Sequence, residues 1–189
     1  GRHSIFLNKK GMNVVGFDNS ENNIKKAKKF EKNFLVFEKR EMTEKYGDNF
    51  DFIFNLFTSF GYVNEEHNIN TLKSINSSLL QNGILIIDYL NIHKIKKELV
   101  EKESKKINNI IFNINRFFED NFIIKRINVI DKNKKFEFTE KVMKLGLNDF
   151  QKYFEKFNLE ILNVFGDYSL NKFNKNSDRL IMIIKKSQP

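Results

Sequence analysis

Apolar residues in the first half of the chain alternate between short strand-like runs and helical spacing. Four runs rich in β-branched and aromatic residues predict buried strands, namely Met12–Phe17, Phe34–Glu38, Phe50–Leu56 and Ile84–Leu90. Between these runs the apolar spacing predicts helices, namely Ser4–Lys10, Glu21–Lys32 and a longer one that Asn64 caps and that stops at Gln81–Gly83. In the second helix we expect Ile24, Ala27 and Phe30 on the buried side. This alternation predicts an α/β fold with a doubly wound, mostly parallel sheet.

The pattern changes after the fourth run. A lysine-rich helix is expected over His93–Lys105, and residues Ile107–Leu147 then alternate between apolar and polar positions in three stretches. With hairpin loops at Glu119–Asn121 and Asp131–Lys134, this predicts a three-stranded antiparallel β-meander. We therefore expect a single domain over residues 1–189, with the meander at about 107–147 inserted into it.

The end of the chain predicts one more helix and a hairpin. Asn148 and Gln151 form the expected capping pair of this helix. Its expected buried stripe consists of Leu147, Phe150, Phe154 and Phe157. Two last strands, at about Glu160–Gly166 and Arg179–Lys185, are expected to close the chain as an antiparallel hairpin.

An acidic residue ends the first predicted strand. Asp18 follows Phe17, and Ser20 then offers a hydroxyl as the N-cap of the next helix. A carboxylate in this position of α/β nucleotide-binding folds accepts hydrogen bonds from the two hydroxyls of a ribose. Gly1 precedes the first helix, so glycine, helix, strand and acid form the second half of a nucleotide-binding βαβ unit. We therefore expect the first strand of that unit to lie before Gly1.

Composition narrows the function classes. The formal net charge of +9 favours a polyanionic partner, but lysine supplies most of the 33 basic residues, alongside much asparagine, isoleucine and phenylalanine. All these residues have A/T-rich codons, so base composition explains the charge equally well, and nucleic acid is not the favoured partner. The chain has no cysteine and its three histidines are dispersed, so we expect no metal site. No apolar run is long enough to span a bilayer, and we expect a cytoplasmic protein without membrane contact; oligomeric state has no signature.

From Gly1 to about Asn91 the sequence resembles the class I S-adenosylmethionine-dependent methyltransferases. G-R-H-S resembles the end of the glycine-rich loop of that family, so that the chain starts inside this motif, and G-F-D-N-S resembles its acidic second-strand end. Glu41-Met42 resembles the pair that borders adenine, and D-F-I-F-N-L-F-T-S-F-G-Y resembles the fourth strand with its loop. L-L-Q-N-G-I-L-I-I-D resembles the segment leading into the fifth strand, although Gln81-Asn82 replaces Pro-Gly and only Gly83 remains. The terminal hairpin also fits the family.

This resemblance implies S-adenosylmethionine as the cofactor and methyl transfer to a small-molecule acceptor whose identity is open. It implies a cofactor site of Gly1, Arg2, Asp18, Asn19, Glu41, Met42, Asn55, Leu56 and Phe57. Acceptor-site candidates follow the fourth and fifth strands or lie in the meander, namely Ser59, Tyr62, Asn91, Arg116 and Glu140. No residue stands out as a general base, so catalytic residues stay unassigned. We expect the meander to act as a lid that shapes the acceptor site.

Three alternatives remain open from the sequence. An RNA methyltransferase would use the net positive charge. A non-catalytic binding protein on a degenerate methyltransferase fold would account for the missing first strand and the lack of an evident base. A dinucleotide-binding oxidoreductase would share the glycine and the acid, but it does not account for the loop N-L-F-T-S-F-G-Y or for the terminal hairpin.

Overall fold

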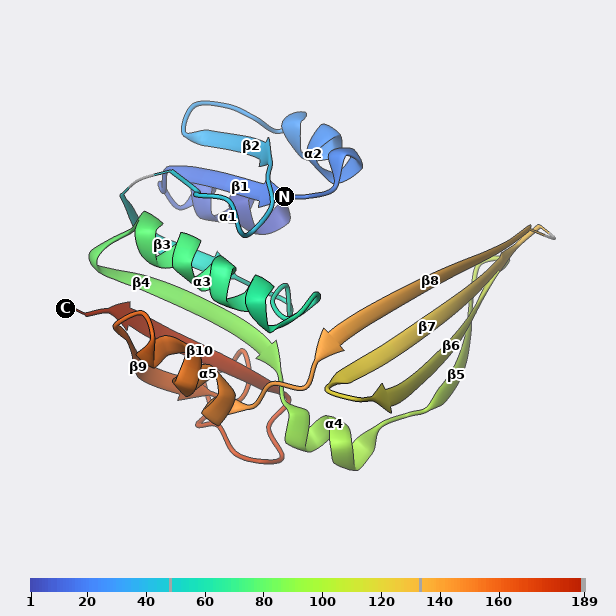
Figure 1. The fold of residues 1–189 in the computed structure, drawn as a ribbon. Coiled ribbons are helices and arrows are strands. Elements are labelled where there is room, and N and C mark those ends of the chain that lie inside the picture. Colours follow the sequence, from blue (N-terminus) through green and yellow to red (C-terminus); the bar gives the residue numbers. More distant parts are fainter. Residues whose placement is uncertain (48, 133, 188–189) are drawn as a thin grey trace. The chain divides into compact units, whose positions relative to one another are not determined.

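The computed structural model of the protein describes residues 1–47, 49–132 and 134–187 (Figure 1). These residues divide into two compact units, the first being Gly1–Tyr46 and the second starting at Gly47. No helix in the described ranges combines the length and apolar character needed to cross a membrane.

The first unit is a small α/β layer. It consists of α1 (Arg2–Lys9), β1 (Val14–Asp18), α2 (Glu21–Lys28) and β2 (Leu35–Lys39). Strands β1 and β2 pair in parallel, with Val14 opposite Leu35 and Asp18 opposite Lys39. A small core of Ile24, Ala27, Leu35 and Phe37 lies between the helices and the strands. Each predicted strand and helix in this unit is therefore confirmed to within a few residues.

Close packing in this unit depends on Gly16 in β1. A Cβ atom there would lie 2.8 Å from both the Ser4 hydroxyl oxygen and the Phe37 ring, and real structures essentially never contain contacts that short. Gly16 therefore allows α1 and the Phe37 side chain to approach the strand.

The predicted burial of Phe30 is wrong. Helix α2 ends at Lys28, with Lys29 as its C-cap, one turn before the predicted end at Lys32. Phe30 then lies in the connection to β2 and is 58% exposed. Helical spacing predicts Phe30 on the same face as Ile24 and Ala27, both of which are buried. Because the helix ends at Lys28, Phe30 is not part of that face.

The second unit contains a four-stranded sheet with two helices packed on it (Figure 1). Its elements are β3 (Phe50–Asn55), α3 (Glu65–Ser78), β4 (Leu79–Leu90), α5 (Leu147–Glu155), β9 (Leu159–Phe165) and β10 (Arg179–Lys186). The strand order is β3-β4-β10-β9; β3 and β4 are parallel, whereas β10 runs antiparallel to β4 and β9. The predicted terminal hairpin is thus confirmed, and β10 lies inside the sheet. The core includes Leu72, Ile75, Leu85, Ile87, Phe150, Phe154, Met182 and Ile184.

Helix α3 begins where the sequence predicts. The Asn64 side-chain oxygen accepts the backbone N–H of His67 at 2.8 Å, as an N-cap does. The helix ends at Ser78, before the predicted stop, and the Gln81–Gly83 turn forms an irregularity within β4, where the register with β3 shifts between Phe50 and Phe52. A Cβ atom at Gly83 would lie 2.8 Å from the Leu80 carbonyl oxygen, so glycine is required at this bulge.

The meander has four strands rather than the predicted three. After α4 (Ile92–Glu98) come β5 (Lys102–Ile107), β6 (Ile110–Glu119), β7 (Phe122–Asp131) and β8 (Lys134–Met143), paired antiparallel in this order. The predicted helix over His93–Lys105 is therefore wrong in its second half. The segment K-E-S-K-K-I has little apolar character of its own, and its strand conformation comes from pairing with β6. Figure 1 shows the meander extending away from the four-stranded sheet of the same unit.

Helix α5 uses a different cap from the predicted one. It begins at Leu147 with Gly146 as N-cap, and the Asp149 carboxylate accepts the Gly146 backbone N–H at 2.8 Å. Asn148 already lies inside the helix, so the predicted pair of Asn148 and Gln151 is wrong. Phe150 and Phe154 are buried as expected, Tyr153 joins them, and Leu147 and Phe157 are only partly buried.

A pair of substitutions in the first unit tests its core. Phe37 is 2% exposed, and replacing it by alanine removes a large buried side chain, so Phe37→Ala is expected to lower the free energy of unfolding by about 3–5 kcal/mol. Phe30→Ala is the matched control in the same unit and is expected to change that free energy by less than about 0.5 kcal/mol. Urea unfolding followed by circular dichroism measures both. Equal losses for the two variants would contradict the end of α2 at Lys28.

Candidate functional site

A buried carboxylate organises the second unit at the carboxyl ends of β3 and β4. Asp88, near the end of β4, is 1% exposed. Its Oδ1 atom accepts the Arg179 Nε–H at 2.6 Å, and its Oδ2 atom accepts the Phe57 backbone N–H at 2.9 Å and the Tyr168 hydroxyl at 3.0 Å. The Arg179 guanidinium also donates to the Thr58 hydroxyl oxygen at 2.9 Å. Asp88 thus connects β4, β10, the loop after β3 and the loop before β10.

The loop after β3 has an uncommon backbone conformation. Phe57 and Thr58 both lie in the left-handed region, with φ of 56° and 58°. Such conformations are unfavourable for residues other than glycine and persist where surrounding contacts impose them. Here Asp88 imposes them, because its carboxylate accepts the Phe57 N–H and its backbone carbonyl accepts the Thr58 N–H at 2.9 Å. The half-exposed Phe57 ring lies 6.1 Å from the Tyr168 ring, centroid to centroid.

A cavity of about 690 Å³ lies beside this loop, within the second unit. It opens between the loop after β3, helix α4 and the meander. Apolar lining comes from Phe57, Leu90, Ile95, Leu99, Val100, Ile123 and Val142, and polar lining from Thr58, Tyr62, Lys94, Glu98, Glu103, Lys105, Arg116, Lys125, Glu140, Asp178 and Arg179. Ligands of open α/β sheets bind at the carboxyl ends of the strands, which is where this cavity lies.

Every cation that lines the cavity is bound to an acid. Arg116 contacts Glu103 at 2.8 Å, and Lys125 contacts Glu140 at 3.0 Å. The other pairs are Lys105 with Glu103, Lys94 with Glu98 and Asp178, and Arg179 with Asp88. Hydrogen bonds from Lys105 and then Arg116 lower the pKa of Glu103. The cavity therefore offers ion pairs rather than a field of one sign.

Three of the five predicted acceptor-site residues line this cavity. Tyr62, Arg116 and Glu140 come from the loop after β3 and from two meander strands, and the structure brings them to one cavity. Burial, and then the charge of Glu140, raise the pKa of the Tyr62 hydroxyl. Tyr62 therefore stays protonated near neutral pH and is a hydrogen-bond donor toward the cavity.

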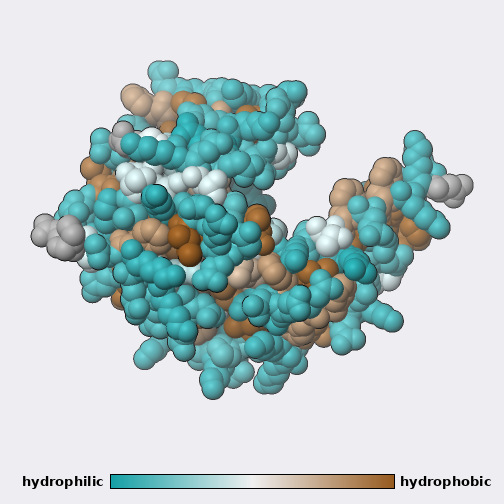
Figure 2. Space-filling model, viewed as in Figure 1, coloured by the Kyte–Doolittle hydropathy of each residue, from teal (hydrophilic) through white to brown (hydrophobic). Residues whose placement is uncertain are grey.

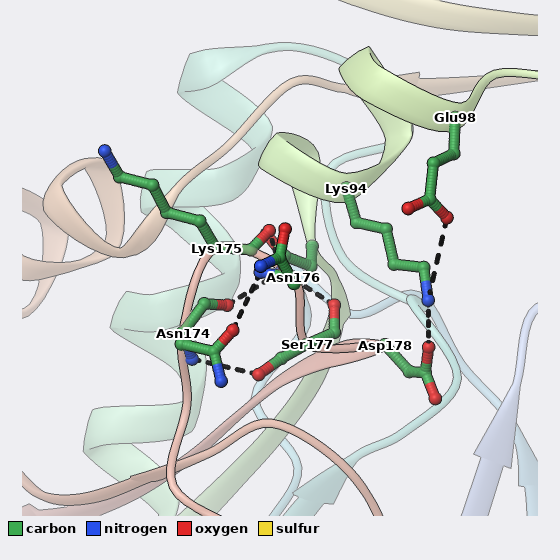
Figure 3. Close-up of polar contacts among 8 residues, drawn as sticks. Lys94, Glu98, Asn174, Lys175, Asn176, Ser177 and Asp178 are labelled. Carbon is green, nitrogen blue, oxygen red and sulfur yellow. Dashed lines mark hydrogen bonds and ion pairs between the residues drawn. The ribbon is translucent and has the colours of Figure 1, made fainter.

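The other two predicted acceptor-site residues, Asn91 and Ser59, form side-chain hydrogen bonds with backbone atoms of the protein. Asn91 is 1% exposed, and its side-chain amide donates to the carbonyl oxygens of Asn174, Lys175 and Ser177, while its oxygen accepts the His93 N–H as the cap of α4. Figure 3 shows the polar contacts of the 174–178 segment, with Lys94 beside Asp178 and Glu98. The Ser59 hydroxyl donates to the Leu56 carbonyl at 2.6 Å. Neither Asn91 nor Ser59 is among the residues that line the cavity.

Asp18 ends β1 in the first unit and is partly buried. Its Oδ1 atom accepts the Ser20 backbone N–H at 2.8 Å, and its Oδ2 atom accepts the Asn23 side-chain amide at 3.0 Å. These bonds hold the carboxylate at the strand end and connect it to the start of α2. Because a carboxylate has about four acceptor positions, two bonds leave acceptor capacity for a ligand.

The remaining predicted cofactor residues are divided between the units. In the first unit, Gly1 is the N-cap of α1, Arg2, Asn19 and Glu41 are exposed, and the Met42 carbonyl accepts the Tyr46 hydroxyl at 2.7 Å. In the second unit, Asn55 is buried at the end of β3, Leu56 is partly buried and Phe57 lines the cavity.

Sequence reasoning missed Arg179 and Tyr168. Arg179 was assigned only as the start of the last strand, and Tyr168 lay in a loop without a pattern. One signal for a partner was present, because Asp88 is an acid inside the apolar run I-L-I-I-D-Y-L, and a buried carboxylate requires a cation or several donors. Which of the basic residues fills that role depends on the pairing of β4 with β10, and no local pattern encodes that pairing.

The fold of the chain is similar to those of solved methyltransferase structures. No family model matches the chain, and no curated protein matches it. Among solved structures, an S-adenosylmethionine-dependent methyltransferase from Clostridium acetobutylicum is similar with a TM-score of 0.82 and 20% identity, over 93% of this chain and 76% of that one. The methyltransferase CcbJ from Streptomyces caelestis is similar with a TM-score of 0.81 and 13% identity, over 96% and 78% of the two chains. The sugar N-methyltransferase KedS8 from Streptoalloteichus has a TM-score of 0.71 and 11% identity, over 92% and 71%.

At these identities the likeness establishes the fold. The chain has the Rossmann-like α/β fold of class I S-adenosylmethionine-dependent methyltransferases, and the predicted fold class is confirmed. The fold by itself does not assign a reaction to these residues.

Substitutions at the buried ion pair test its role. Arg179→Met leaves the Asp88 carboxylate buried without its cation, so we expect a loss of about 3–5 kcal/mol in the free energy of unfolding. In Asp88→Asn/Arg179→Met the unpaired charge is removed, and the double variant is expected to be more stable than Arg179→Met alone. Arg126→Met, at an exposed arginine of β7 whose guanidinium lies 5.0 Å from the centre of the Phe117 ring, is the control and should cost at most about 1 kcal/mol. A double variant that is no more stable than Arg179→Met alone would contradict the role of Arg179 as the cation that matches Asp88.

The hydroxyl of Tyr62 provides a pH test of the cavity geometry. Because the folded state raises the Tyr62 pKa, its stabilising contribution is complete below the ordinary value of about 10 and disappears as the pH rises through the folded pKa. Glu140→Gln is expected to lower the Tyr62 pKa while leaving it above the ordinary value, since burial remains. The measurement is an NMR titration of labelled tyrosines, with Tyr62→Phe identifying the resonance. Glu137→Gln, on the other face of β8, should leave this pKa unchanged, and an equal shift there would contradict the assignment.

Proposed function

We propose that the protein is an S-adenosylmethionine-dependent methyltransferase that transfers a methyl group to a small-molecule acceptor. The observation that carries this proposal is the cavity at the carboxyl ends of β3 and β4, in a chain that has the fold of these enzymes. The cofactor supplies an activated methyl group when bound. The chain's own residues then have to hold the acceptor in line and exclude water.

The residues of the first unit fit the nucleoside part of this cofactor. The Asp18 carboxylate is held at the strand end by Ser20 and Asn23 and retains acceptor positions for two ribose hydroxyls. Asn19, which follows Asp18 in the sequence, and Glu41, in the loop after β2, are both exposed. Met42 follows Glu41 and offers an apolar side chain suited to adenine. We assign Gly1 and Arg2, at the start of α1, to the methionine part, because a helix N-terminus and a guanidinium favour a carboxylate.

In the second unit, the candidates are the last residue of β3 and the two residues that follow it. We assign Asn55, Leu56 and Phe57 to the cofactor as well, with the Phe57 ring suited to a cationic sulfonium. Phe57 also lines the cavity, together with Tyr62, Arg116 and Glu140. The Asp88–Arg179 pair fixes the backbone on which Phe57 lies, so these two residues act by positioning. Ser59 and Asn91 enter the proposal only as supports of the loops around the cavity.

The charges of the cavity favour a small molecule over RNA. Polyanion recognition needs cations whose charge is not already matched, because binding gains free energy from released counterions. Each cation of this cavity forms an ion pair with a carboxylate, with nitrogen–oxygen distances of at most 3.8 Å. An RNA acceptor predicts a steep salt dependence of binding, which a titration with transfer RNA at two salt concentrations measures.

Asp18 provides the sharpest test of the cofactor assignment. Asp18→Ala removes hydrogen bonds to a charged acceptor and is expected to cost the cofactor about 1.5–3 kcal/mol, or roughly tenfold to hundredfold in affinity. Isothermal titration of the full-length protein with S-adenosylmethionine measures this. Asn22→Ala is the control, because Asn22 is an exposed residue of the same helix that takes no part in the two bonds to Asp18, and it is expected to leave affinity within about twofold.

The outcomes of this titration separate the proposals. Unchanged affinity in a folded Asp18→Ala protein would contradict the nucleotide site. No binding by the unsubstituted full-length protein would favour a non-catalytic protein on this fold.

A further inference from the structure

All the meander residues that line the cavity from β5 to β8 lie on one face of that sheet. Side chains alternate between faces along a strand, and the register places Arg116, Lys125 and Glu140 side by side in one row. The next row toward the four-stranded sheet contains Phe118, Ile123 and Val142. Glu103 and Lys105 of β5 belong to the same face, since they pair with Ile114 and Phe112. We call this the cavity face.

Beyond the charged row, the cavity face becomes mostly apolar. Two rows follow toward the turn between β7 and β8. On β6 to β8 the first consists of Ile114, Ile127 and Phe138 and the second of Phe112, Val129 and Phe136, while the edge strand β5 adds Glu103 to the first row and Lys105 to the second. On the opposite face the same stretch includes Ser104, Asn113, Asn128 and Glu137, with Ile111 and Ile130 between Lys106 and Lys135. The concentration of apolar side chains is therefore a property of the cavity face.

These apolar rows are open to solvent. Phe136 is 47% exposed and Phe138 is 55% exposed, while the other four side chains are partly buried. Figure 2 shows hydrophobic residues among hydrophilic ones over the meander. Exposed apolar side chains that form a continuous surface mark a binding site, unlike those that are scattered singly.

We propose that the acceptor is an amphipathic small molecule that binds along the cavity face. Its apolar tail lies on the two rows from Ile114 to Phe136, and its polar head lies at the charged row of Arg116, Lys125 and Glu140. The argument for this occupant is continuity, because the apolar rows directly adjoin the charged row, whose three residues line the cavity. The proposal rests on the proposed function only in naming the bound molecule as the methyl acceptor.

The charged row indicates the chemistry of the head. Glu103 binds Arg116, and Glu140 binds Lys125, with side chains between 23% and 48% exposed. A head with one positive and one negative group can pair with Lys125 and Glu140 at once, whereas a single charge leaves one of them without its partner. Along the strand, the far apolar row lies four residues from the charged row, or about 13 Å. The cavity face therefore fits a zwitterionic head with a tail of that length.

A homologous series of probes tests this. Nε-acyl-lysines keep a zwitterionic head constant while the acyl tail is lengthened from acetyl to decanoyl. Binding is measured by isothermal titration on the full-length protein without cofactor, below the concentrations at which the probes aggregate. Affinity is expected to rise roughly two- to fourfold per added methylene over the middle of the series. An affinity independent of tail length would overturn the proposal.

A matched pair of variants locates the tail. Phe136→Ser should reduce the gain of the longest probes by about threefold to tenfold and leave the acetyl probe unchanged. Phe52→Ser in β3 is the control, because Phe52 is 48% exposed, close to the 47% of Phe136, and lies outside the meander. Equal effects of the two variants would overturn the assignment of the tail to the cavity face.

The experiment separates this inference from the proposed function. Tail-dependent binding without methyl transfer from labelled cofactor to any probe would support the site and contradict methyl transfer to such molecules. Methyl transfer to short acceptors without tail dependence would support the enzyme and overturn the amphipathic acceptor. If the rows instead pack against a second copy of the chain, light scattering gives a dimer that Phe136→Ser dissociates, and tail length has no effect, which also overturns it.

Discussion

The buried contact between Asp88 and Arg179 is the interaction on which the candidate site depends. A carboxylate that is 1% exposed is unfavourable unless its charge is matched and its lone pairs are used. Here one carboxylate takes a guanidinium, a backbone N–H and a phenol hydroxyl from three separate segments. Because Arg179 opens β10, the antiparallel insertion of the last strand beside β4 brings the cation to this position. The terminal hairpin is therefore part of the site's construction and not only an extension of the sheet.

The same constraint extends to the meander through the loop after β3. Gly61 has φ of 84°, and a Cβ atom there would lie 2.6 Å from the Tyr89 hydroxyl oxygen. That hydroxyl donates to the Met143 carbonyl at 2.7 Å, and the Met143 N–H donates to the Gly61 carbonyl at 2.8 Å. The end of β8 is thus fixed to the loop that Asp88 holds from its other side. Phe57 and Glu140 can therefore line one cavity although they lie 83 positions apart in the sequence.

The sequence predicted the features that local chemistry determines. Asp18 at the end of a strand, Asn64 as a helix cap and the loop at Asp120 all depend on a few neighbouring residues, and the structure has each of them. The wrong predictions concern elements whose conformation depends on pairing or packing with other segments of the chain. Strand β5 exists because β6 is beside it, and α2 ends before Phe30 because the chain must turn into β2. The cavity was predicted in part, since Tyr62, Arg116 and Glu140 were expected there. Asp178 and Arg179 reach it through the pairing of β10 with β4, which no motif records.

The electrostatics of the cavity place a condition on any ligand. Its acidic and basic side chains already form ion pairs. An incoming charged group must therefore bind its new partner at least as strongly as did the side chain that it displaces. Ligands with one net charge fail this condition, because they leave a like-charged side chain behind. A ligand with balanced charge, or with only hydrogen-bonding groups, keeps the pairs satisfied, and its remaining binding energy has to come from apolar contact. Selectivity in this cavity would then depend on the shape and length of the apolar part rather than on the sign of the charge, which links the ion pairs of Arg116 and Lys125 to the apolar rows beyond them.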